Sequence, residues 1–438
     1  MASLESPNSA PRSPSFTIGP PTSFTFVRSI SNKEPSFASS DFSCARPRLS
    51  HVSFSPVLFS SQSPPLAFPS HLTNQNDAVQ ASAHHRCVSS VLKKDGQILA
   101  VASALDGGLI YTGSGTNVVR VWRLPEFAEC GQLKTRSAAA VVAIEVSNNK
   151  VYAAYTDGKI RVWRRSWDGA AKHARLGTIP SAGSYVRSYI SSKEKTTKHL
   201  APISSLAMNV SDDILYSASL DKTVKVWRIS DHKCIETIQA HSEPVNAVAV
   251  GGDGVLYTAS DDATVRVWRR NFWGGGDDRP HSLTLSLPAK ESPVKALSLT
   301  ADGSVLYGGC TDGYVHFWFR GWFTGQLQYG GALQGHTHAV LCLASVGNFV
   351  VSGSADATGR VWVREQDGQH MCIAVLQGHR GPIRSVAALP RRTVADEAEE
   401  GCTVCTGSLD GVLKVWRVTF TSNSGRAPAE NSREYSEM

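Results

Sequence analysis

A short motif with a tryptophan near its end recurs along this chain, with 41 to 64 residues between successive tryptophans. It reads SLDKTVKVWR in one copy and SDDATVRVWR in the next, and each tryptophan closes a run of β-branched and charged residues typical of a strand. A repeat of this length is one supersecondary unit that can bury its apolar face only against a neighbouring copy. The seven tryptophans are Trp122, Trp163, Trp227, Trp268, Trp318, Trp362 and Trp416.

The segments between these tryptophans favour an all-β fold. Each unit has a second apolar run about ten residues before its tryptophan, such as ILYSAS or VLYTAS, and Asp-Gly pairs that favour tight hairpins separate many of the runs. No long stretch has helical periodicity. No run of about eighteen apolar residues occurs, so the sequence does not predict a membrane-spanning helix.

Polar residues recur at fixed distances from the tryptophan. An aspartate stands six residues before it in all units except the first, which has Thr116, and a serine often stands two residues before that position. A histidine opens four of the units. The four complete sets are His199, Ser219, Asp221 and Trp227; His241, Ser260, Asp262 and Trp268; His336, Ser354, Asp356 and Trp362; and His379, Ser408, Asp410 and Trp416.

With these motifs the chain resembles the WD-repeat β-propeller family over residues 84–418. The resemblance implies a seven-bladed propeller with four strands in each blade. It also implies that the aspartate accepts a hydrogen bond from the histidine, whose other nitrogen meets the serine hydroxyl, and that this hydroxyl bonds the indole. Such a network would satisfy the polar groups of a buried turn.

A Ser-His-Asp catalytic system is the alternative interpretation of these residues. Four copies at one register argue against it, because an enzyme needs a single nucleophile beside an oxyanion hole. We therefore expect no catalytic residue and no cofactor. We also expect no metal site, since Cys402 and Cys405 stand three apart in an expected strand, would point to opposite faces, and suit core packing better.

The two ends of the chain have a different composition. Residues 1–83 hold twenty serines and four acidic residues without a usable period, which predicts a disordered arm, and residues 419–438 predict a disordered tail. Cysteines without a recurring framework indicate a reduced intracellular protein of the cytoplasm or nucleus. The serine-rich, acid-poor start also resembles a transit peptide, which would place the protein in a chloroplast.

Closure of the ring needs one more strand. After Trp416 only RVTF precedes the polar tail, so the seventh blade lacks its outer strand. An open ring would leave two exposed sheet edges. We expect residues 86–94, RCVSSVLKK, to pair beside residues 412–418.

Two sets of residues are candidates for partner binding. Next to the network residues, on the rim we call the top rim, we expect Glu243, Asp261, Glu291, His338 and Arg380 to face solvent. The second set lies in an insertion between Trp163 and His199 whose formal charge, eight bases minus two acids, is +6 in a chain of +7. As one loop, this insertion is either a solvated spacer packed over the top rim or a binding loop. A binding loop of this composition would suit an acidic or phosphorylated protein better than nucleic acid. Its candidates are Tyr185, Arg187, Tyr189, Lys193, Lys195 and Lys198.

The YVRS insertion and the SASLDKTVKVWR unit after it also resemble a plant group of WD-repeat proteins named for the JINGUBANG protein. The resemblance implies a plant regulatory protein without enzymatic activity, an interaction scaffold in a signalling or transcriptional pathway. The alternative is a substrate-recognition subunit of a cullin-type ubiquitin ligase. Such adaptors carry an acidic residue directly after the tryptophan, whereas this chain has Arg123, Arg164, Arg228, Arg269, Phe319, Val363 and Arg417.

Overall fold

The computed structural model divides the chain into residues 1–75 and residues 76–438, and only part of the second unit is described here. Most of the predicted N-terminal arm (1–83) and C-terminal tail (419–438) lies outside the described residues. Residues 82–83, however, begin a strand (Ser82–Leu92) and residues 419–421 end another (Val412–Thr421), so the structure corrects both predicted boundaries. No helix in the described part of the chain is long and apolar enough to span a membrane. The described ranges are 82–104, 108–147, 149–167, 171–181, 197–271, 280–289, 292–321, 325–365, 367–391 and 399–421.

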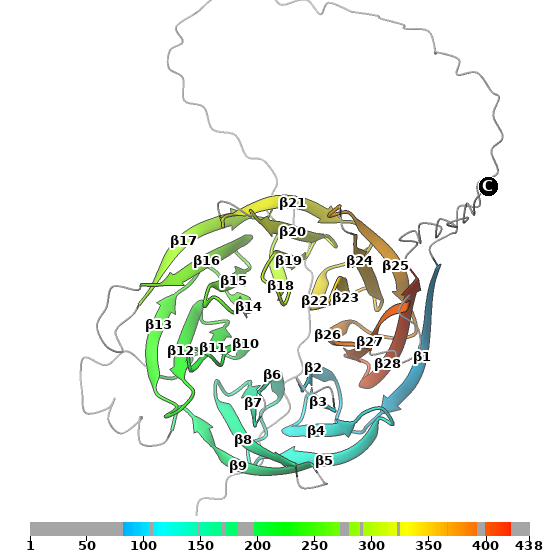
Figure 1. Ribbon diagram of the computed structural model, residues 1–438. Helices are drawn as coiled ribbons and strands as arrows, with labels where there is room; N and C mark the ends of the chain where they lie inside the picture. The colour runs from blue at the N-terminus through cyan, green and yellow to red at the C-terminus, as the bar shows by residue number, and fades with distance from the viewer. Residues whose placement is uncertain are drawn as a thin grey trace, which may run out of the picture. The chain divides into compact units, whose positions relative to one another are not determined.

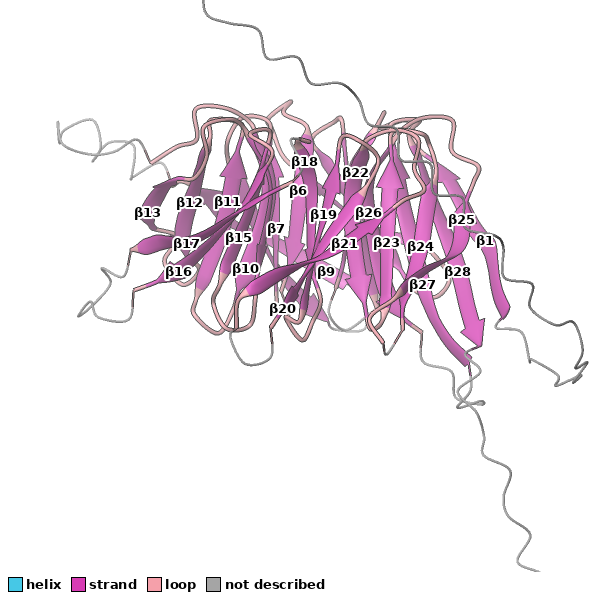
Figure 2. Cartoon of the chain, turned by 90° about the horizontal axis from the view of Figure 1, so that it is seen from above, coloured by secondary structure: helices cyan, strands magenta, loops and turns pink. Residues whose placement is uncertain are grey.

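Within these ranges the chain forms seven four-stranded antiparallel sheets arranged around a central axis, which confirms the seven-bladed propeller (Figure 1). Seen edge-on, the strands run between two rims of loops (Figure 2). Blades one to three are β2 (Ile98–Ser103), β3 (Leu109–Ser114), β4 (Val118–Arg123) and β5 (Ala128–Lys134); β6 (Val141–Val146), β7 (Lys150–Tyr155), β8 (Ile160–Trp167) and β9 (Ala171–Ile179); and β10 (Ile203–Asn209), β11 (Ile214–Ser219), β12 (Thr223–Arg228) and β13 (Cys234–Gln239).

Blades four to six repeat the same order from the axis outward. They are β14 (Val245–Val250), β15 (Leu256–Ser260), β16 (Thr264–Arg270) and β17 (His281–Pro288); β18 (Val294–Leu299), β19 (Val305–Cys310), β20 (Val315–Arg320) and β21 (Leu327–Leu333); and β22 (Val340–Val346), β23 (Phe349–Ser354), β24 (Gly359–Arg364) and β25 (His370–Leu376). Blade seven has β26 (Ile383–Pro390), β27 (Glu399–Ser408), β28 (Val412–Thr421) and, on its outer edge, β1 (Ser82–Leu92).

The hydrophobic core is a ring of clusters, one between each pair of neighbouring blades. Each repeat tryptophan packs on the blade before its own: Trp227, for example, joins a cluster with Tyr152 and Val162 of blade two. The second strand of a blade is covered on both faces, so all six residues of β11 are buried. A single repeat therefore cannot bury its core alone, and the period seen in the sequence follows from this packing.

The ring closes through β1, as the sequence predicts. This strand pairs antiparallel with β28, from Ser82 opposite Thr421 to Leu92 opposite Val412, with an irregularity between Cys87 and Ser89. Most β1 side chains are exposed, so its backbone ladder contributes more than its side chains do. Blade seven thus joins the two ends of the described chain in one sheet (Figure 1).

Tyrosine–histidine pairs link three of the blade interfaces near the lower rim, the rim opposite the network residues. In each pair a tyrosine from the second strand of one blade bonds a histidine from the outer strand of the next, and the rings meet edge to face at 5.6 Å between centroids. The hydroxyl-to-Nε2 distances are 2.9 Å for Tyr111–His173, 3.1 Å for Tyr216–His281 and 2.8 Å for Tyr307–His370.

The structure corrects the interpretation of the long insertion as one loop. Its first part forms β9, which pairs with β8 as the outer strand of blade two. The eight bases are therefore divided: Arg164 and Arg165 lie in β8, and Lys172 and Arg175 in β9. A strand was missed here because AKHARLGTI mixes charged and small residues, whereas an outer strand needs apolar residues on one face only.

Truncation tests the closing strand. We expect deletion of residues 1–81 to leave the melting temperature unchanged, because β1 stays intact. Deletion of residues 1–95 should lower it by roughly 5 °C or more, because the edge of β28 loses its ladder partner. Differential scanning calorimetry of both truncated chains decides the matter, and equal melting temperatures would contradict this account of closure.

Candidate functional site

In blade three a chain of hydrogen bonds joins the turn after β11 to the core. His199 Nδ1 lies 2.9 Å from Asp221 Oδ2, and His199 Nε2 lies 2.8 Å from the hydroxyl of Ser217. The same hydroxyl accepts the indole N–H of Trp227 at 2.8 Å. The carboxylate also accepts the backbone N–H of Leu200 at 2.9 Å, so the network fixes the loop before β10 as well as the turn after β11.

The same arrangement recurs in blades four, six and seven, and we call each copy a lock. The aspartate-to-histidine distances are 2.8 to 3.1 Å, and the histidine-to-hydroxyl distances are 2.7 or 2.8 Å. The members are His241, Asp262, Thr258 and Trp268; His336, Asp356, Ser352 and Trp362; and His379, Asp410, Thr406 and Trp416.

The predicted hydroxyl was wrong in all four locks. Ser219 instead donates to the carbonyl of Ala201 and accepts the N–H of Asp221, both at 3.1 Å, so it closes the turn without touching histidine or tryptophan. Alternate residues of a strand share a face, and the hydroxyl two residues earlier is the one that reaches the indole. Ser260, Ser354 and Ser408 act as Ser219 does.

A threonine two residues after the aspartate is a further member that sequence reasoning missed. Thr223 Oγ1 donates to Asp221 Oδ1 at 2.6 Å, and Thr264 and Thr358 do the same in blades four and six. The signal in the sequence is Asp-x-Thr. Blade seven has Val412 at this position and keeps only its backbone N–H bond to Asp410.

The donors and acceptors of a lock fit a neutral histidine. Nδ1–H donates to the carboxylate, while Nε2 accepts the hydroxyl proton. Burial lowers the pKa of His241, His336 and His379 despite the neighbouring carboxylates. Burial alone would raise the pKa of Asp356, but hydrogen bonds from Thr358 and His336 outweigh it and lower that pKa to about 2.

These locks have a structural role. Ser217 has no exposed surface and His199 is 1% exposed, so the hydroxyl cannot meet a substrate while the blade is folded. The same hydroxyl oxygen also accepts the indole N–H of Trp227. A buried, repeated set of this kind serves to satisfy polar groups and fix a turn.

In blade two a different interaction holds the turn after the second strand. Its aspartate, Asp157, is bound by the guanidinium of Arg161 at 2.7 Å, and that guanidinium also stacks 4.0 Å from the ring centre of Tyr155. Ala153 stands where blades three, four, six and seven have a lock hydroxyl. Blade two therefore holds its turn by an ion pair next to an aromatic ring.

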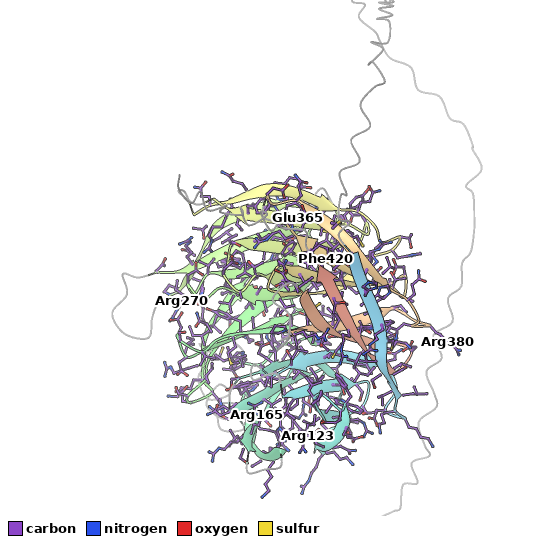
Figure 3. All side chains as sticks on the ribbon, turned by 45° about the vertical axis from the view of Figure 1, so that its right-hand side comes forward. Arg123, Arg165, Arg270, Glu365, Arg380 and Phe420 are labelled. Atoms are coloured by element: carbon purple, nitrogen blue, oxygen red, sulfur yellow. The ribbon has the colours of Figure 1, made fainter. Side chains whose placement is uncertain are left out.

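The residue after the tryptophan lies at the lower rim, away from the locks. Arg228 Nη1 pairs with Asp231 at 3.1 Å across the turn that follows β12. Figure 3 labels Arg123, which directly follows Trp122 in β4, and Arg165 and Arg270, which stand two residues after the tryptophans of β8 and β16. The residue directly after the tryptophan is not acidic in any of the seven units, whereas the ligase alternative requires an acid there.

Cys402 and Cys405 take part in two different cores. Cys402 packs between blades six and seven, whereas Cys405 packs between blades seven and one. The two thiols therefore lie on opposite faces of β27 and cannot bind one ion together.

Four of the candidate partner-binding residues on the top rim are described. Glu243, His338 and Arg380 are exposed, and Asp261 is half-buried. Asp261 pairs with Lys295 and accepts Asn246 Nδ2 at 2.8 Å, while Glu243 lies 3.4 Å from Lys222 Nζ. Lys198 is half-buried, and Tyr185, Arg187, Tyr189, Lys193, Lys195 and Glu291 lie outside the described residues.

The fold and the locks define a class: a seven-bladed propeller whose blades are fastened by Asp-His-Ser/Thr-Trp networks. A comparison with family models agrees. The model described as WD domain, G-beta repeat, matches residues 191–228, 232–269, 281–318, 327–363 and 370–417. The chain is therefore a WD-repeat protein.

Curated relatives share the repeats over part of their length. Telomerase protein component 1 of Rattus norvegicus is 26% identical over 75% of this chain and 11% of its own. Zinc finger CCCH domain-containing protein 17 of Oryza sativa is 32% identical over 29% of this chain and 24% of its own. Cell division control protein 4 of Candida albicans is 38% identical over 19% of this chain and 11% of its own. The chain thus spans at most about a quarter of each of these relatives.

A double-mutant cycle tests which hydroxyl belongs to the lock. Ser217→Ala and Ser219→Ala should each destabilise, since each leaves buried groups without a partner at about 1–3 kcal/mol per group. Only Ser217→Ala should couple to Trp227→Phe, by about 1 kcal/mol, because the two side chains share a hydrogen bond. Urea unfolding of the single and double variants measures this, and coupling to Ser219 instead would contradict the assignment.

Proposed function

We propose that this protein is a non-enzymatic scaffold that binds partner proteins on the top rim of its ring. One observation carries the proposal: exposed side chains stand one or two residues after lock histidines, next to backbone groups that the locks hold. Arg380 follows His379, and its N–H donates to Asp410 Oδ2 at 2.9 Å. His338 follows Thr337, whose N–H donates to Asp356 Oδ2 at 3.2 Å. A surface held in this way loses little conformational entropy on binding.

The chemistry of this rim supports an acidic or phosphorylated partner. The acids Glu243 and Asp261 already lie within ion-pair distance of Lys222 and Lys295. Arg380, by contrast, is exposed and presents a guanidinium, which suits bidentate contact with carboxylate or phosphate. Nucleic acid and membrane lipid are not part of the proposal.

We place this scaffold in a signalling or transcriptional pathway of a plant cell, in the cytoplasm or nucleus. Support comes from the sequence, namely the YVRS and SASLDKTVKVWR segments and their resemblance to the plant group. A plant protein, from rice, is also among the curated relatives. The chloroplast alternative depends on residues 1–81, which lie outside the described part of the chain.

The ligase-adaptor alternative makes a separate prediction. It requires that the protein co-purify with a cullin adaptor through residues at or near the tryptophan ends. Since Arg228 pairs with Asp231 where an acid would be needed, no observation in the structure favours it. Failure of co-purification would remove this alternative without affecting the scaffold proposal.

Proximity labelling in plant cells tests the scaffold. The variant Arg380→Glu combined with His338→Glu changes the top rim at two exposed positions. The control Glu365→Lys changes an exposed charge that follows β24 at the lower rim. Figure 3 labels Arg380 and Glu365. We expect the top-rim variant to lose at least one labelled protein at an unchanged melting temperature, while the control keeps the wild-type set.

Identical labelled sets for the wild type, the top-rim variant and the control would contradict binding at these positions. Loss of the same proteins in both variants would contradict the assignment to the top rim.

A further inference from the structure

Blade five lacks the lock and has a different set of side chains in its place. Gly308 stands where blades three, four, six and seven have the lock hydroxyl, and the opening histidine is missing. Cys310 replaces the turn serine, and Ser292 from the preceding loop supplies the missing acceptor, taking the N–H of Asp312 at 3.2 Å. The thiol of Cys310 is thereby left out of the turn hydrogen bonds that Ser219 makes in blade three.

Three metal-binding donor atoms meet at this turn. The sulfur of Cys310, a carboxylate oxygen of Asp312 and a ring nitrogen of His316 all lie within 4.8 Å of one another. Cys310 is the last residue of β19 and His316 the second of β20, so paired strands hold the two ends of the set. Cys310 has no exposed surface and His316 is 1% exposed, whereas the Asp312 side chain is 32% exposed.

The side chain of His316 is oriented as a metal-binding histidine would be. Its Nδ1 lies 3.0 Å from the hydroxyl of Tyr329 on β21, while Nε2 faces the carboxylate, 3.6 Å from Asp312 Oδ2. A bond from the second ring nitrogen to a neighbouring group is the usual way in which proteins orient a metal-binding histidine. The rings of Trp318 and Tyr329 flank the imidazole, with centroids 6.4 and 5.9 Å away.

We propose that Cys310, Asp312 and His316 form a zinc site at the top rim of blade five. Thiolate, imidazole and carboxylate are ligands that Zn²⁺ accepts together, and a water on the exposed Asp312 side would complete a tetrahedron. Zinc bonds of 2.0–2.3 Å place the donors roughly 3–4 Å apart, so the three side chains need move only slightly. Binding releases the thiol proton of Cys310 to solvent.

The ion would fasten the turn after β19, as the locks fasten the other turns. Sequence reasoning missed this set because its Cys-x-Asp-x-x-x-His spacing falls on ordinary repeat positions, and the two strands bring the ends together only once paired. The inference is independent of partner binding, because it concerns how blade five holds its own turn.

Cobalt(II) titration of the reduced, metal-free full chain tests the site. We expect one Co²⁺ per chain, with a thiolate charge-transfer band and the strong visible bands of tetrahedral coordination, both removed by added Zn²⁺. Cys310→Ser should abolish the charge-transfer band, and His316→Gln should weaken binding at least tenfold. Cys87→Ser is the matched control, since it removes an exposed thiol and should change nothing.

Asp312→Asn keeps the test decisive if the buried variants unfold. This side chain is partly exposed and nearly isosteric with asparagine, so the variant should fold, bind Co²⁺ at least tenfold more weakly, and lose the rise in melting temperature that Zn²⁺ gives the wild type. Absence of the charge-transfer band in the wild type, its persistence in Cys310→Ser, or unchanged affinity in Asp312→Asn would overturn the proposal.

Discussion

The indole of the repeat tryptophan is the group on which the rest of the structure depends. Its ring packs on the preceding blade, as Trp416 does on blade six, and so forms part of each blade interface. Its N–H meanwhile donates to a buried hydroxyl, Thr112 in blade one and the lock hydroxyl in blades three, four, six and seven. One side chain therefore joins apolar packing between blades to polar order within a blade.

The locks connect the buried indoles to exposed backbone of the top rim by hydrogen bonds. From the indole the bonds pass through a hydroxyl and a histidine to a carboxylate, which then accepts the backbone N–H of an exposed residue such as Leu200 or Arg380. The top-rim loops of these blades are thus tied to the core by hydrogen bonds as well as by chain connectivity. Blade two reaches a comparable result with Arg161, and blade five has Cys310 and His316 beside its aspartate.

The fold and the closure of the ring could be predicted from the sequence because the same residue pattern occurs in several repeats. The Asp-to-Trp spacing predicts the blades, and the missing outer strand of blade seven predicts the pairing of β1 with β28. The sequence could not distinguish Ser217 from Ser219, since both lie on one face of β11. The register between β11 and β12 decides between them, because it places Leu215 opposite Trp227 and so brings Ser217 nearer to the indole. The sequence also did not predict β9. This strand is defined by its pairing with β8 and its half-exposed position, and both exist only in the assembled blade.

The most direct test of the account is amide hydrogen exchange at Leu200. This residue is 80% exposed, yet its N–H is bound by the lock of blade three. We predict a protected Leu200 amide in the wild type. Its exchange should be at least about tenfold faster in Ser217→Ala, a variant that changes only the buried end of the lock's hydrogen-bond network. Ser298→Ala, which removes a hydroxyl bonded to Ser345 outside any lock, should leave it protected. An unprotected Leu200 amide, or one equally protected in Ser217→Ala, would contradict the claim that the locks hold the top-rim loops.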